Sequence, residues 1–180
     1  MRQFQALRKA GKTAESDKVA ADWQKARPTE TAFDMYFGDE ALARKDPAEA
    51  ERHYRAAADK DGGQVLALNN LAYVLALQGK PGAVEAAEKA LKGAPNQVAL
   101  LDTLAFALES ANQLPRALEV QTRVVKLAPD LPQFRLQLAR LKLKSGDKAA
   151  ARDELKQLAK LGERFPRQNE VAELLKSAGG

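Results

Sequence analysis

Residues 98–131 carry the sequence VALLDTLAFALESANQLPRALEVQTRVVKLAPDL, and this stretch decides the fold. Its first half places apolar side chains three and four residues apart, at Leu101, Leu104, Ala105 and Leu108. Its second half continues the same spacing through Ala117 and Val124 until Pro129 interrupts it. Apolar residues at these intervals indicate one buried face of a helix, and a proline past the last turn ends it. The stretch therefore predicts two helices joined by a short turn.

The landmarks of this stretch recur along the chain with a period of about 34 residues. A small residue stands at Ala50, Ala83, Ala117 and Ala151. A fixed period of about this length is typical of stacked helix–turn–helix repeats, which present an extended concave surface for binding. We predict four repeats, at residues 31–64, 65–97, 98–131 and 132–165, preceded by a partial or degenerate repeat at 1–30 and followed by a capping helix and tail at 166–180.

The repeat unit resembles the tetratricopeptide consensus, in which small residues let the two helices approach closely. Ala72, Ala105 and Ala139 occupy the close-contact position of their first helices. The resemblance implies an all-α fold, a right-handed α-α superhelical tetratricopeptide-repeat solenoid. Breaks between helices are expected near residues 45–47, 61–64, 79–81, 94–97, 112–114, 128–131 and 145–147. Gly146 and Asp147 predict a glycine stop followed by an aspartate cap.

A narrower resemblance covers roughly residues 31–178. The runs ALNNLAYVLALQGK (67–80), LLDTLAFALE (100–109) and FPRQNEVAELLKS (165–177) are similar to the C-terminal part of the PEP-CTERM system tetratricopeptide lipoproteins. This resemblance implies a scaffold of a bacterial exopolysaccharide or surface-protein sorting system, on the periplasmic side of the cell envelope. The lipobox cysteine of that family is missing, and a cytoplasmic location is the alternative. Met1 begins partway through a helical pattern, so the chain is expected to be a C-terminal fragment.

The residue types needed for chemistry are scarce. The chain has no cysteine and a single histidine, His53, so it offers no thiolate nucleophile and no cluster of histidine ligands, and any catalytic triad would depend on His53 alone. The run Gly79-Lys80-Pro81-Gly82 lacks the spacing of a phosphate-binding loop. We therefore expect no enzymatic activity, no cofactor and no metal. No apolar run is long enough to span a bilayer, and the N-terminus is too polar for a signal peptide.

The first helix of each repeat is expected to line the concave face. Counting along the repeats gives the candidate protein-binding groove: Met35, Asp39 and Leu42; Asn69, Tyr73 and Leu77; Asp102, Phe106 and Glu109; and Leu136, Arg140 and Lys144. Tyr73 and Phe106 are expected to stand side by side as an aromatic anchor for an extended peptide. The alternative, of equal weight, is that both rings only pack between neighbouring helices.

Polar groove residues suggest how a peptide would be held. Asn69 and Asp102 could hydrogen-bond a peptide backbone. Asn70 matches one asparagine of the clamp by which some tetratricopeptide domains bind a C-terminal carboxylate. Such a clamp does not fit, because the next repeat has Ala99 and Thr103 where basic groups are required.

Two further hypotheses remain, and the first of them rests on the net charge of +5. The whole excess lies in residues 132–180, which carry 11 basic and 6 acidic side chains. The second hypothesis is therefore binding of an anionic polymer, such as a polysaccharide, through Arg135, Arg140, Lys142, Lys144 and Lys148. Nucleic acid is disfavoured, since Phe134 is the only base-stacking aromatic nearby. The third hypothesis is a homo-oligomer formed through an apolar N-terminal edge at residues 1–30. The leading hypothesis remains a scaffold for a protein or peptide partner.

Overall fold

A computed structural model describes residues 1–60 and 65–179, and within these ranges it contains helices and no strand. The helices are α1 (Arg2–Lys9), α2 (Thr13–Ala26), α3 (Ala32–Ala43), α4 (Pro47–Lys60), α5 (Val65–Leu77), α6 (Ala83–Gly93), α7 (Val98–Ser110), α8 (Leu114–Leu127), α9 (Pro132–Lys144), α10 (Lys148–Ala159), a 3-10 turn (Gly162–Arg164) and α11 (Gln168–Ser177). The predicted all-α fold is confirmed.

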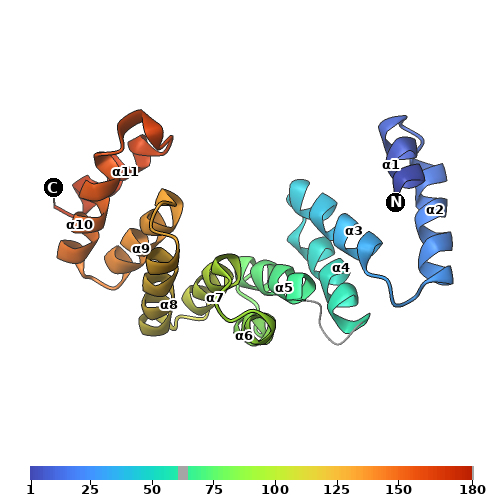
Figure 1. The fold of residues 1–180 in the computed structure, drawn as a ribbon, viewed down its shortest axis with the longest axis horizontal. Coiled ribbons are helices and arrows are strands. Elements are labelled where there is room, and N and C mark those ends of the chain that lie inside the picture. The colour runs from blue at the N-terminus through green and yellow to red at the C-terminus, as the bar shows by residue number, and fades with distance from the viewer. Residues whose placement is uncertain (61–64, 180) are drawn as a thin grey trace.

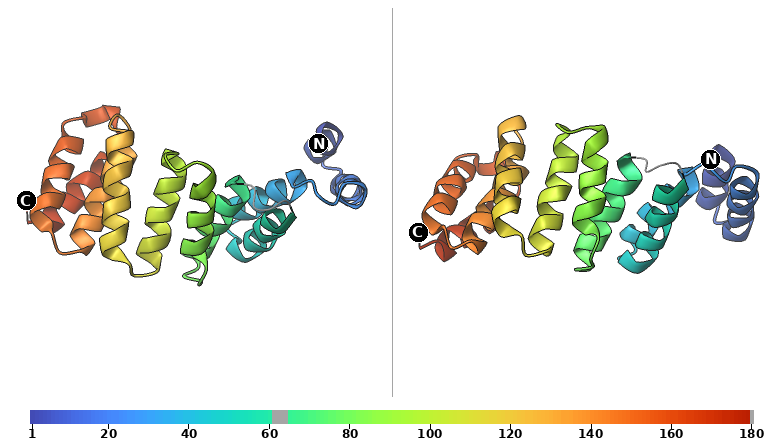
Figure 2. Two further views of the ribbon diagram at one scale, coloured as in Figure 1. Left: turned by 60° about the horizontal axis from the view of Figure 1, so that its bottom comes forward. Right: turned by 90° about the horizontal axis from the view of Figure 1, so that it is seen from below.

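Successive helices pair with one another, and the pairs stack into a curved row with the two termini at opposite ends (Figures 1 and 2). In the middle of the arc, α5 and α7 lie on the inner side and α6 lies on the outer side (Figure 1). The chain is therefore a superhelical solenoid, and at its centre the first helices α5 and α7 face the hollow of the arc.

The predicted breaks between helices agree with the structure. Six of the seven fall between two helices, and the seventh, at 61–64, lies outside the described residues. Gly146 has a φ of +87°, a left-handed conformation that favours glycine, and it ends α9. The Asp147 carboxylate then accepts a 3.0 Å hydrogen bond from the backbone N–H of Ala150 and caps α10. The predicted glycine stop and aspartate cap are confirmed.

Small residues set the spacing within each pair. Ala72, Ala105 and Ala139 are at most 1% exposed, and so is Ala117 in the second helix that pairs with the helix of Ala105. In the first full repeat the same position is held by Gly38. A Cβ added to Gly38 would lie 2.5 Å from Cε1 of the fully buried Tyr54. The large ring on α4 therefore requires a residue without a side chain on α3.

An aromatic cluster attaches the N-terminal pair to the rest of the solenoid. The Phe4 ring of α1 is fully buried, and it contacts three rings of α3. The ring centroids lie 5.0 Å from Phe33, 4.9 Å from Tyr36 and 5.7 Å from Phe37. The interplanar angles are close to 90°, the edge-to-face arrangement that aromatic pairs prefer. Residues 1–30 thus form a short helix pair that packs on α3 chiefly through the Phe4 ring, with a second ring contact between Trp23 and Phe33 at 6.2 Å.

The C-terminal helix closes the other end. Val171 of α11 packs against Leu155, Leu158 and Phe165, and this covers the last apolar face. The Arg152 guanidinium of α10 donates hydrogen bonds to the carbonyl oxygens of Ala178 (2.6 Å) and Gly179 (3.0 Å). The predicted capping helix is therefore present and is fastened at its C-terminal end.

A polar bridge joins the first and second full repeats. The Glu51 carboxylate of α4 accepts hydrogen bonds from Lys80 Nζ (2.6 Å) and Gln78 Nε2 (3.0 Å), which both follow α5. The hydrogen bond from Lys80 is the largest influence on the pKa of Glu51 and lowers it. Burial raises this pKa, but hydrogen bonds from Arg55 and Gln78 lower it further, so it falls to about 2. The bridge is therefore strongest when Glu51 is ionised.

We predict that Ala105→Leu lowers the melting temperature, because the added carbons must fit between α7 and α8. Overpacking of this kind typically destabilises a protein by about 1–3 kcal/mol. Ala99→Leu is the matched control, since Ala99 lies on a more accessible side of the same helix. Thermal unfolding followed by circular dichroism measures both variants. Equal effects of the two substitutions would contradict the close-contact assignment.

We predict that the stability advantage of the wild type over Glu51→Gln depends on pH. The folded-state pKa of about 2 lies below the ordinary 4.5, so the ionised bridge stabilises the fold above pH 4.5. This contribution is lost as the pH falls from 4.5 towards 2. Melting temperatures of both proteins between about pH 7 and pH 2 test the prediction. A difference in melting temperature between the two proteins that stays constant across this range would rule out the ionised bridge as its cause.

A candidate protein-binding groove

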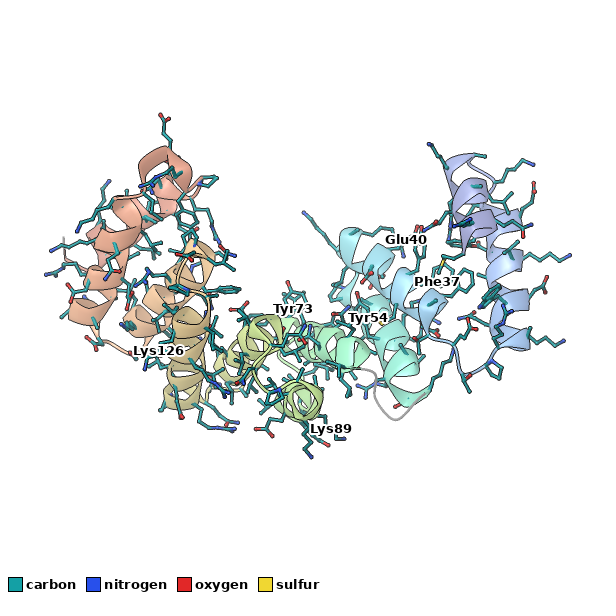
Figure 3. The ribbon with its side chains drawn as sticks, viewed as in Figure 1. Phe37, Glu40, Tyr54, Tyr73, Lys89 and Lys126 are labelled. Atoms are coloured by element: carbon teal, nitrogen blue, oxygen red, sulfur yellow. The ribbon has the colours of Figure 1, made fainter. Side chains whose placement is uncertain are left out.

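The inner face of the arc carries an exposed apolar stripe along α5. Leu66 is 60% exposed, Tyr73 41% and Leu77 50%. Their spacing of seven and four residues places all three on one side of the helix. Figure 3 shows Tyr73 on the inner side of the arc and Lys89 of α6 on the opposite side. We call Leu66, Tyr73 and Leu77 the α5 stripe.

The next helix extends the stripe sideways. The Phe106 ring of α7 lies with its centroid 5.5 Å from that of Tyr73, at an interplanar angle of 37°. Phe106 is half-buried and packs against the central core, whereas Tyr73 is exposed. The expected side-by-side placement of the two rings is therefore found, and Tyr73 is more than a packing residue because much of its surface meets solvent.

A row of polar groups lies between the α5 stripe and α3. The buried Tyr54 hydroxyl donates a 2.6 Å hydrogen bond to Oδ1 of Asp39. Burial, followed by this contact with Asp39, raises the pKa of Tyr54, so the hydroxyl keeps its proton. Asn69 Nδ2 donates to Oδ1 of Asn70 at 3.4 Å. The carboxamide oxygen of Asn69 is buried and has no hydrogen-bond partner among the described residues.

Asp102 lies on the other side of α5, on α7. Its carboxylate accepts a 3.1 Å hydrogen bond from Nε2 of Gln121, a fully buried side chain of α8. The same Nε2 also donates to the carbonyl oxygen of Phe134 at 3.1 Å, so Gln121 ties α7 and α8 to α9. Burial raises the pKa of Asp102, and the Gln121 hydrogen bond opposes that shift.

The basic end of the groove is compensated by ion pairs. Arg140 pairs with Glu170 of α11, and Lys144 Nζ lies 3.1 Å from Oε1 of Glu109. Glu109 also accepts a hydrogen bond from Gln137 at 3.1 Å. In contrast, Asp39 and Asp102 form no ion pair within the described residues. The two uncompensated charges of the predicted groove are therefore negative.

The remaining basic residues of the predicted anionic-polymer site are also largely paired. Arg135 and Lys142 both contact Glu154, at 2.5 and 2.8 Å. Burial works against ionisation of Glu154, but these two cations outweigh it and lower the pKa of Glu154. Arg135 and Lys142 are thus engaged within the fold and are less available to an anionic polymer, although the net excess of residues 132–180, which already counts Glu154, is unchanged.

Three other residues of the predicted groove contribute little open surface. Met35 and Leu42 of α3 are half-buried and pack against the central core. Leu136 of α9 was expected to face the groove, and this expectation is wrong because its side chain is fully buried. It packs in the same cluster as Phe165 and Val171, so the capping segment covers it. The sequence pattern missed Leu66, although its spacing of seven from Tyr73 would have identified it.

His53, the single histidine of the chain, lies apart from the predicted groove. His53 lies beside a hollow of about 380 Å³ between α2, α3 and α4, and its ring is tilted over Phe37 at 5.4 Å. Burial, the largest influence, lowers the pKa of His53. Within residues 1–60 and 65–179, no group of three or more histidine or acidic residues could hold a metal ion. The helices in these ranges are also too short or too polar to cross a membrane.

Comparison with known proteins gives likeness in structure alone. No protein-family model and no curated protein matches this chain. MamA from Desulfovibrio magneticus RS-1 superposes with a TM-score of 0.78 at 16% sequence identity, covering 91% of this chain and 93% of that chain. TTC0263, a thermophilic TPR protein of Thermus thermophilus, superposes with a TM-score of 0.68 at 19% sequence identity, covering 83% of this chain and 81% of that chain. An O-GlcNAc transferase of Thermobaculum terrenum superposes with a TM-score of 0.66 at 19% sequence identity, covering 72% of this chain and 26% of that chain.

These identities are all at or below 19%, so the likeness concerns the fold. The stacked helix pairs, the small residues between them and the superposition on a known TPR protein agree with one another. From these observations we conclude that the chain has the fold of a tetratricopeptide-repeat solenoid.

Proposed function

We propose that this chain is a non-enzymatic scaffold that holds a segment of a partner protein in its concave groove. The observation that carries the proposal is the α5 stripe together with the neighbouring Phe106 ring. Three of the five large hydrophobic side chains that are strongly exposed in the described residues lie in this stripe. Clustered exposed apolar side chains are typical of interaction sites, whereas scattered ones need no explanation.

The stripe has the composition of a binding hot spot. Burial of apolar surface contributes about 25 cal/mol per Å² removed from water, so Leu66, Tyr73 and Leu77 together offer a large driving force. Aromatic residues near the centre of an interface often dominate its energy. The polar groups of Asp39, Asn69 and Asp102 surround this centre and would orient the partner.

A binding role also agrees with the absence of a reactive constellation among the described groove residues. Their polar members are three carboxylates, a carboxamide, a phenol and two paired cations, and they include no serine, threonine or cysteine nucleophile beside a histidine base. The likeness to the O-GlcNAc transferase covers about a quarter of that enzyme, so it supports the shared repeat fold and no transfer activity. We therefore include neither a cofactor nor a substrate for chemistry in the proposal.

The proposed setting is the periplasmic side of a bacterial cell envelope, within an exopolysaccharide or surface-protein sorting system. The resemblance of runs such as residues 67–80 to the PEP-CTERM system lipoproteins supports this setting. Fractionation of the bacterium that encodes the chain tests it directly. Recovery of the full gene product in the cytoplasmic fraction would reject the envelope setting and leave the groove proposal standing.

The two other hypotheses gain no comparable support. Of the five basic residues expected to bind an anionic polymer, four are ion-paired and Lys148 is not paired within the described residues. Self-association through residues 1–30 was expected to use apolar surface. The five strongly exposed large hydrophobic residues of the described chain lie outside this segment: Leu66, Tyr73, Leu77, Leu127 and Leu131.

We predict that the double change Tyr73→Ala with Phe106→Ala abolishes capture of the partner. Truncating a central aromatic anchor commonly weakens binding by about 2 kcal/mol or more. The purified chain is immobilised, incubated with a lysate of the source bacterium, and the retained proteins are quantified by mass spectrometry. The expected result is a protein that the wild type enriches and the double variant does not.

The matched control is Leu127→Ala with Leu131→Ala, which removes two exposed apolar side chains outside the first helices of the repeats. We expect this control to keep partner capture. Circular dichroism verifies that both variants remain helical. Loss of capture in the control, with retention in the groove variant, would move the binding site away from the concave face.

A further inference from the structure

We infer that the groove binds a basic amphipathic helix, which lies along α5 and places cationic side chains beside Asp39 and Asp102. This inference rests on the proposed function and specifies the shape and charge of the partner segment. It combines two independent observations, the direction of the apolar stripe and the sign of the unpaired charges beside it.

The direction of the stripe favours a helical partner. Leu66, Tyr73 and Leu77 follow one helix over a span of about 16 Å, at 1.5 Å per residue. A partner helix with apolar side chains at intervals of three and four residues can contact all three at once. An extended strand that crosses the repeats at the level of Tyr73 would instead meet Asp39, Phe106 and Arg140 on the other first helices.

The charges beside the stripe favour a basic partner. Asp39 lies on α3 and Asp102 on α7, the first helices on either side of α5 (Figure 1). Each carboxylate is held by one neutral donor, Tyr54 for Asp39 and Gln121 for Asp102, with no cation among the described residues. The two cations of the predicted groove, Arg140 and Lys144, are ion-paired with Glu170 and Glu109. Lysine or arginine side chains flanking an apolar face would complement this arrangement.

The net charge of the whole chain predicts a preference for acidic peptides, the opposite of the preference inferred from the groove. A protein of net charge +5 attracts acidic peptides at long range. Near physiological salt, screening limits such attraction to about 8 Å, so the carboxylates closest to the bound helix decide the preference. Local geometry and global charge thus make different predictions for the same measurement.

Three synthetic probes test the inference by fluorescence anisotropy. Each is a peptide of about 18 residues, or five helical turns, with blocked ends and leucines at intervals of three and four residues. The first flanks the leucine face with lysines, the second replaces every lysine by glutamate, and the third is the lysine peptide with two central prolines. We expect the lysine peptide to bind about tenfold more tightly than the glutamate peptide, from about threefold per carboxylate. We expect the proline peptide to bind at least about tenfold more weakly, because proline breaks the helix.

Variants of the chain assign the preference to its source. Asp39→Asn with Asp102→Asn should remove most of the preference for lysine over glutamate. Asp22→Asn with Asp153→Asn is the matched control, since it removes two exposed carboxylates outside the groove, and the preference should persist. Tyr73→Ala with Leu77→Ala should weaken binding of both charged peptides. Circular dichroism of each variant verifies the fold.

Several results would overturn the inference. These are a glutamate peptide that binds as tightly as the lysine peptide, a proline peptide that binds equally well, or no binding of any probe to the wild type. The capture experiment with Tyr73→Ala and Phe106→Ala separates the two proposals. If capture depends on these rings while the probes fail, the groove is a binding site for a partner of different shape or charge. If capture is also independent of the rings, the proposed function fails as well.

Discussion

The whole solenoid depends on how closely the two helices of each pair approach one another. Gly38, Ala72, Ala105 and Ala139 occupy the same position in successive first helices, and each is buried. A larger side chain at any of them would have to be accommodated between two closely packed helices. The helix pairs that carry the groove are thus held by small residues that lie outside it.

Charge is distributed by pairing between elements that are far apart in the sequence. Lys144 reaches Glu109 in the preceding repeat, Arg140 reaches Glu170 in the capping helix, and Lys80 reaches Glu51. Pairs of this kind are individually weak at the surface, but they determine which charges are left for a partner. The result is a groove whose uncompensated groups are acidic in a chain whose total charge is basic.

The period of about 34 residues was sufficient to predict the helices, the turns and the placement of Tyr73 beside Phe106, because these depend on local spacing and on the regular stacking of repeats. The burial of Leu136 could not be predicted in this way, since it depends on how the capping segment folds back over α9. The ion pair of Arg140 with Glu170 was missed for the same reason. The pair of Lys144 with Glu109 was missed because the period places the two helices side by side but does not determine the conformation of a long lysine side chain. The groove role of the predicted residues stays a prediction.

The alternation of roles along α5 has an evolutionary consequence. Ala72 is fully buried and its chain neighbour Tyr73 is exposed, so helix packing constrains the first residue and partner binding constrains the second. Substitutions at Leu66, Tyr73 or Leu77 alter the surface offered to a partner and leave the buried close contact at Ala72 unchanged. A descendant of this chain can therefore acquire a new partner through a few changes on one helix face while inheriting its architecture intact.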